Sequence, residues 1–169
     1  MIQDFGNRID DFEEFFTKAL VSGREKINSV GLPVKDGLFN LLDYLKTTNL
    51  KLAVASSSAT SLVVTNCERV GIDAKIFTSI IGGEKVTHSK PHPQTYLNAC
   101  EVLKISPEDA IAIEDSDHGI TSAFNAGLKP ILIPDIKKPT DDALQMAYKT
   151  CSSLNDVINI ISSELRISQ

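Results

Sequence analysis

Apolar and polar positions from residue 33 onward repeat with two different periods, which predicts helices and strands in alternation. Leucines spaced three and four residues apart predict a helix over 38–45, and the apolar run "KLAVAS" that follows predicts a buried strand. Further strands are expected in "IFTSIIG", "IAIED" and "PILIP", with a helical pattern between each and the next. Strands that alternate with helices build βαβ units, so we expect an α/β fold with a parallel sheet covered by helices on both faces.

Residues that begin or end helices fall at the boundaries of these patterns. Gly71 follows a helical pattern over 60–70, and Gly127 follows another, so both are expected to end a helix in the left-handed conformation. Ser106 precedes a proline and is expected to begin a capped turn. Upstream of the α/β pattern, phenylalanines on one face predict a separate helix over 12–20.

Composition and charge narrow the class of protein. The 169 residues carry a formal net charge of −5 and a sequence pI of about 5.2, with 42% hydrophobic residues. That length fits one domain with its own core. Because no basic patch could neutralise many phosphates, we expect neither nucleic acid nor a membrane surface as a partner.

The cysteines and the N-terminus indicate the compartment. Cys67, Cys100 and Cys151 are far apart and form no C-x-x-C pair, which is typical of reduced thiols rather than of disulfides or a zinc site. No apolar run approaches the length of a membrane-spanning helix, and the acidic first residues do not resemble a signal peptide. The expected location is the cytoplasm.

Polar groups suited to chemistry follow three of the predicted strands. Serines occupy 56–58 after the first strand, Lys90 lies in a proline-rich loop after the second, and Glu114 and Asp115 end the third. Parallel strands bring their carboxyl ends to one edge of a sheet, where ligands bind. Two adjacent carboxylates with no evident cationic partner in sequence favour a bound metal, and Mg²⁺ prefers oxygen ligands together with phosphate and water.

Each of these groups also has a plain structural interpretation. Ser57 or Ser58 could cap the next helix, Lys90 could be a solvated surface residue, and Asp115 could cap the helix after the third strand. The combination favours a magnesium-phosphate site instead, because hydroxyls and amides bind phosphate and a lysine neutralises its charge. We expect Lys90→Ala to change the free energy of unfolding by no more than about half a kcal/mol, as for a surface residue.

The order and wording of these motifs resemble the haloacid dehalogenase superfamily, and most closely its β-phosphoglucomutase-like phosphatases. The motifs "LAVASSS", "SKPHPQTY" and "IAIEDSDHGI" occur in the family's order and with family-like spacing, and the resemblance runs from about residue 33 to the C-terminus. It implies a Rossmann-like parallel sheet, Mg²⁺ as the cofactor and a small phosphorylated metabolite as the partner.

The resemblance also implies a role for each residue. Ser56 and Lys90 would be catalytic, and the phosphate would be bound by these two together with Ser57 and Ser116. Glu114 and Asp115 would hold the metal.

One family motif has no counterpart in the chain. It is an apolar strand that ends in Asp-x-Asp-Gly, whose first aspartate is the nucleophile, whereas "MIQDFGN" has one aspartate and no second acid two residues later. The resemblance therefore implies that 1–32 are the remnant of a helical cap domain and that 33–169 are a core lacking its first strand. A missing N-terminal segment or another chain would have to supply the nucleophile.

The leading interpretation is a Mg²⁺-dependent phosphohydrolase that works through a phospho-aspartate on a substrate such as a sugar phosphate. A phosphomutase of the same subfamily and a non-catalytic phosphate-binding fragment are the alternatives. A signalling receiver domain also combines acids, a hydroxyl and a lysine around Mg²⁺, but its acidic pair comes early in the chain, whereas here the pair comes last.

Overall fold

A computed structural model describes residues 31–167, which lie almost wholly within the second of two compact units, Val34–Gln169. The helix expected over 12–20 lies outside the described residues. So does the proposed cap remnant 1–32, apart from its last two residues.

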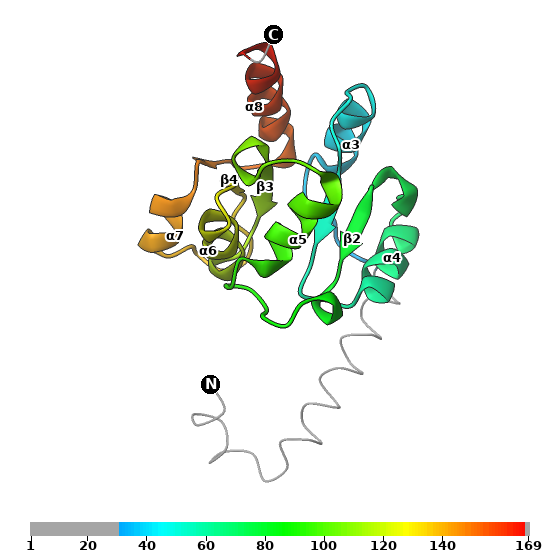
Figure 1. Cartoon of the computed structure of the whole chain (residues 1–169). Coiled ribbons are helices and arrows are strands. Elements are labelled where there is room, and N and C mark those ends of the chain that lie inside the picture. The colour runs from blue at the N-terminus through cyan, green and yellow to red at the C-terminus, as the bar shows by residue number, and fades with distance from the viewer. Residues whose placement is uncertain (1–30, 168–169) are drawn as a thin grey trace. The chain divides into compact units, whose positions relative to one another are not determined.

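All strand pairs of the described unit are parallel, as the alternating pattern predicts (Figure 1). The strands are β1 (Ala53–Ala55), β2 (Ser79–Ile81), β3 (Ile111–Glu114), β4 (Lys129–Leu132) and β5 (Lys149–Thr150). They form two sheets, one of β1 and β2 and the other in the order β3-β4-β5. Within the described residues no strand pairing joins β1 to β3.

Helices cover both sheets. The α-helices are α3 (Leu38–Lys46), α4 (Thr60–Arg69), α5 (Gln94–Leu103), α6 (Asp117–Asn125), α7 (Asp141–Met146) and α8 (Leu154–Ile167). Three short 3₁₀ helices lie in the connections between α-helices and strands: η1 (Ala74–Ile76), η2 (Gly83–Lys85) and η3 (Pro107–Asp109). Helix α5 packs on β1 and β2, α6 packs on β3 and β4, and the two helices contact each other, so they connect the sheets (Figure 1).

Local sequence signals place most of the boundaries correctly. Gly71 and Gly127 follow their helices with φ of 79° and 84°, the left-handed conformation that a side chain disfavours. The turn after Ser106 forms as η3, but the serine side chain makes no capping bond there. Strand β5 was not predicted, because the two-residue segment Lys149–Thr150 is polar and too short to show a period.

The buried apolar residues form three clusters, of which the two largest are built on different helices. Apolar side chains of α3 and α8, such as Leu41 and Val157, pack around Ile131 of β4. Tyr96 and Ala123 belong to a second cluster, formed mainly by α5 and α6. No helix in the described part of the chain is long and apolar enough to span a membrane.

Candidate active site

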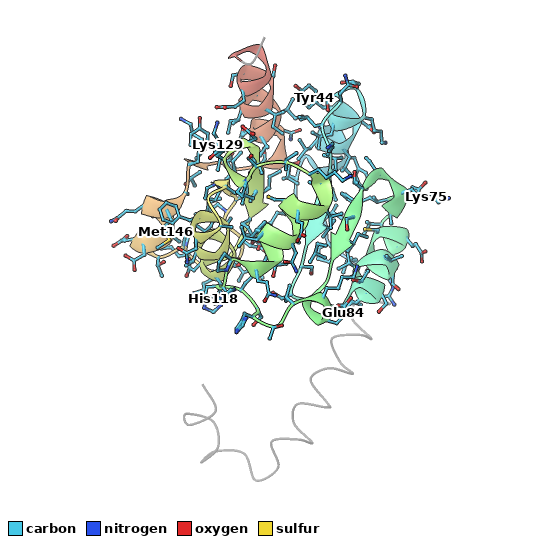
Figure 2. The ribbon with its side chains drawn as sticks, in the orientation of Figure 1. Tyr44, Lys75, Glu84, His118, Lys129 and Met146 are labelled. Carbon is cyan, nitrogen blue, oxygen red and sulfur yellow. The ribbon has the colours of Figure 1, made fainter. Side chains whose placement is uncertain are left out.

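A cavity of about 400 Å³ lies where β1 and β3 end, and it gathers every site residue that the sequence predicts. Figure 2 shows Glu84 and His118 on this same side of the molecule, on the segments that follow β2 and β3. The cavity is lined by Lys35, Ala55, Ser56, Ser57, Ser58, Lys90, Ile113, Glu114, Asp115, Ser116 and Ile133.

The serine loop after β1 is held by a hydrogen bond to the end of β2 and by one within the loop itself. The Ser56 amide donates to the Ile81 carbonyl at 2.9 Å, and the Ser56 hydroxyl accepts from the Ser58 amide at 3.0 Å. Neither Ser57 nor Ser58 caps α4, because the N-cap residue is Ala59. Within residues 31–167, neither the amide nor the hydroxyl of Ser57 makes a hydrogen bond, so both can bind a ligand in the cavity.

The side chain of Lys90 is largely buried, so Lys90 is not the solvated surface lysine of the plain interpretation. Its side chain is 9% exposed, and its ammonium forms an ion pair with Glu114, whose side chain is 10% exposed. The same ammonium donates to the Ala55 carbonyl at 3.0 Å and to the Tyr96 hydroxyl at 3.3 Å. Lys90 therefore joins the end of β1 to the end of β3 from its own loop.

Tyr96, in the first turn of α5, completes the group around Glu114. Its hydroxyl donates to the same carboxylate oxygen that pairs with Lys90, and the Lys90 ammonium lies 4.5 Å from the centre of its ring. Burial, reinforced by the negative charge of Glu114, raises the pKa of the Tyr96 phenol well above its ordinary value. Tyr96 therefore stays neutral and acts as a hydrogen-bond donor.

Asp115 is more open to solvent than Glu114. Its side chain is 46% exposed, and one of its oxygens lies 3.9 Å from the ammonium of Lys35. The same lysine lies 3.5 Å from Asp135, which follows β4. Each acid of the pair thus has a cationic partner, contrary to the expectation from sequence, although the contact of Asp115 is long and solvated.

Ser116 begins α6 by accepting a hydrogen bond from the Gly119 amide at 3.1 Å. The N-cap residue is therefore Ser116, and the alternative in which Asp115 caps this helix is wrong. A Cβ atom on Gly119 would collide with the Glu114 carboxylate, so a side chain at this position would have to displace that carboxylate.

The donor set fits a Mg²⁺ ion that keeps most of its water. No group of three or more His, Cys, Asp and Glu side chains in the described residues could enclose a metal, but Mg²⁺ is commonly held by one or two carboxylates with phosphate and waters. Asp115 is available for direct contact, whereas one oxygen of Glu114 is occupied by Lys90 and Tyr96.

Sequence reasoning missed Lys35, Tyr96 and Gly119. The sequence contains a signal for only two of them. Tyr96 lies six residues after Lys90, in the first turn of the predicted helix. Gly119 is a glycine inside a helix, which often marks a close approach of another group. Lys35 precedes the helix predicted over 38–45 and reaches the cavity by a contact distant in sequence, so no local pattern marks it.

Comparison with known proteins agrees with this geometry. The model of the haloacid dehalogenase-like hydrolase family matches residues 2–133. Over 123 residues the chain is 30% identical to a phosphorylated carbohydrates phosphatase of Thermotoga maritima, an alignment that covers 73% of this chain and 56% of that relative.

Solved structures show the same fold. CbbY from Rhodobacter sphaeroides, in complex with phosphate, aligns with a TM-score of 0.64 and 30% identity over 71% of this chain and 54% of that one. A putative β-phosphoglucomutase from Thermotoga maritima aligns with a TM-score of 0.78 over 96% of this chain and 75% of that one. Because the identity is 24%, this likeness supports the fold alone. This chain spans little more than half the length of the phosphatase and of CbbY. With a Rossmann-like arrangement of parallel strands and a family model that matches most of its length, the chain belongs to the haloacid dehalogenase-like hydrolase family.

Proposed function

We propose that this chain forms the phosphate-binding and Mg²⁺-binding part of a phosphohydrolase that acts on a small phosphorylated metabolite, such as a sugar phosphate. The observation that carries the proposal is the free amide and hydroxyl of Ser57, which share one cavity with the buried pair of Lys90 and Glu114. The 30% identity to a phosphorylated carbohydrates phosphatase supports this substrate class.

The proposed roles follow from what each group can donate or accept. Ser56 and Ser57 donate hydrogen bonds to phosphoryl oxygens, and the Lys90 ammonium neutralises the charge that develops on them. Asp115 and Glu114 would hold Mg²⁺, directly or through water, while Ser116 begins α6 and would donate its hydroxyl to the phosphate. When bound, Mg²⁺ supplies positive charge that stabilises the phosphoryl group during transfer.

The nucleophile in this proposal is an aspartate carried outside this chain, on a strand that adds between β1 and β3. The unpaired edges of these strands support it, as does the exposure of Ile113 of β3, which at 37% is high for an apolar residue of a parallel strand. Residues 33–169 would then be a core lacking its first strand, and 1–32 the end of a cap domain. The strand would come from an upstream segment or from another chain.

The reaction balances over two steps. The incoming carboxylate attacks phosphorus, and the ester oxygen leaves with a proton from a neighbouring acid. Water then attacks the phospho-aspartate, which releases inorganic phosphate and restores the carboxylate. The residues of this chain bind and neutralise the phosphoryl group in both steps.

Titration of the purified chain with inorganic phosphate, in the presence of Mg²⁺, tests the proposal. Amide chemical shifts recorded by NMR should move first at Ser57 and Ser58, and Lys90→Met should weaken binding at least tenfold, because a charge-assisted contact is lost. A wild-type chain whose serine-loop amides do not respond to phosphate would contradict the proposed function.

A further inference from the structure

The turn after β2 lies against the serine loop and the start of α4. Its first residues, Gly82, Gly83 and Glu84, reach across to the segment that follows β1 (Figure 2 labels Glu84 beside the lower end of α4). The Gly83 amide donates to the Ser58 carbonyl at 3.0 Å. The two segments are thus bonded directly, beyond the pairing of β1 with β2.

Glu84 provides the cap that α4 lacks in its own sequence. The N-cap residue, Ala59, has no side-chain acceptor, and the Glu84 carboxylate accepts from the Thr60 amide at 3.1 Å and from the Thr60 hydroxyl. These bonds, that of the hydroxyl first, lower the pKa of the Glu84 carboxyl, which therefore stays ionised at neutral pH. A carboxylate at a helix N-terminus is also favoured by the helix dipole.

Two glycines allow this close approach. A Cβ atom on Gly82 would collide with the Thr60 amide and with Glu84, and a Cβ atom on Gly83 would collide with the Ser57 carbonyl. The backbone of Gly83 therefore lies directly against the carbonyl of Ser57. A side chain at either glycine would push the turn away from the serine loop.

We propose that Glu84 is a positioning residue that holds the loop 56–60 so that the free amide and hydroxyl of Ser57 are ready to receive a phosphate. The inference rests on the proposed function for its ligand, and it assigns to Glu84 no contact with the phosphate itself. The sign of the effect separates positioning from simple electrostatics. The negative charge of Glu84 repels an anion nearby, so electrostatics alone predicts tighter phosphate binding once the charge is removed, whereas positioning predicts weaker binding.

The test compares Glu84→Ala and Glu84→Gln with the wild-type chain, and uses Glu108→Ala as the matched control. Glu108 is also an exposed glutamate in a 3₁₀ helix, and its side chain makes no hydrogen bond in the described part of the chain. Inorganic phosphate is titrated into each protein with Mg²⁺, and the affinity is read from amide chemical shifts. Amide hydrogen exchange is measured without phosphate at Ser58 and Gly83, whose amides donate to Ser56 and Ser58 and not to Glu84.

Glu84→Ala should weaken phosphate binding roughly tenfold and accelerate exchange at both amides, because a charge-assisted cap is lost. Glu84→Gln keeps an acceptor oxygen and should recover part of both losses, while Glu108→Ala should match the wild-type chain. Unchanged or tighter phosphate binding in Glu84→Ala would overturn the inference, even if the melting temperature fell. If the wild-type chain binds no phosphate, the proposed function fails. The exchange rates still show whether Glu84 holds the loop 56–60. Unchanged exchange in Glu84→Ala overturns the inference.

Discussion

Lys90 is the residue on which the contacts of the cavity converge. Its ammonium meets the carboxylate of Glu114, the hydroxyl of Tyr96 and the carbonyl that ends β1, all with little exposure to solvent. The sequence marked Lys90 through the two prolines that follow it, but it could not reveal burial, because the partners come from three other segments. This burial changes the expected effect of removing the lysine.

We predict that Lys90→Ala lowers the free energy of unfolding by about 2–4 kcal/mol, since it leaves the Glu114 carboxylate buried without its cation. This replaces the near-neutral change expected for a surface lysine. The matched control is Lys46→Ala, which breaks an exposed pair with Asp43 (side chains 59% and 72% exposed) and should cost less than about 1 kcal/mol. Urea unfolding measures both, and equal losses in the two variants would contradict the prediction.

Asp115 and Lys35 lead to a prediction about the metal. Asp115→Asn should weaken Mg²⁺ binding by roughly tenfold or more, because it removes the carboxylate most available to the ion. Lys35→Ala should instead tighten binding, since it removes a cation that competes for Asp115. Calorimetric titration with Mg²⁺ measures both variants, with Asp142→Asn as the control, an exposed acid outside the cavity. Unchanged affinity in Asp115→Asn would place the metal elsewhere.

At the scale of elements, the local sequence predicts helix ends better than helix starts. Gly71 and Gly127 end their helices through their own backbone conformation, which the residue type alone signals. The start of α4 depends instead on Glu84, 24 residues away from Thr60. Such a contact depends on residues that follow another strand, so the pattern near 56–60 suggested serine caps that the structure does not form.

Helix α8 starts with a cap that should respond to pH. The Asp156 carboxylate accepts from the Ser152 hydroxyl at 2.8 Å and from the amides of Ser152 and Ser153. These bonds, the hydroxyl's first, lower the pKa of Asp156 below its ordinary value of 3.8. The stability from this cap is therefore complete above that value and is lost as the pH falls through the lower pKa of the folded state.

Asp156→Asn should consequently lose less stability than the wild-type chain when the pH is lowered from about 6 to about 3. Urea unfolding at the two pH values measures the loss. Asp142→Asn provides the control, because the Asp142 carboxylate makes no hydrogen bond within residues 31–167, and it should follow the wild-type chain. An equal acid-induced loss in Asp156→Asn and wild type would show that the cap contributes no pH dependence.

At the scale of the whole molecule, the alternating pattern predicted the α/β class and the common edge at which the serines, the lysine and the acids meet. This worked because parallel strands connected by helices must end on the same side, so order along the chain determines proximity. The pattern did not predict that β1 and β3 would remain unpaired among the described residues, because periodicity reports which face of a strand is buried and not which strands are neighbours.

The unpaired edges and the contents of the cavity lead to the last prediction: the 169-residue chain binds phosphate but does not turn over phosphate esters. Lys90 is committed to Glu114, and Ser56 accepts from the Ser58 amide with no histidine in the cavity lining to act as its base, so neither is a ready nucleophile. Release of inorganic phosphate from a panel of sugar phosphates, with Mg²⁺, measures turnover. Turnover well above background that Asp115→Asn abolishes would mean that the chain carries its own nucleophile. Phosphate binding without turnover, with activity gained when a strand ending in Asp-x-Asp-Gly is supplied in trans or upstream, is the expected result.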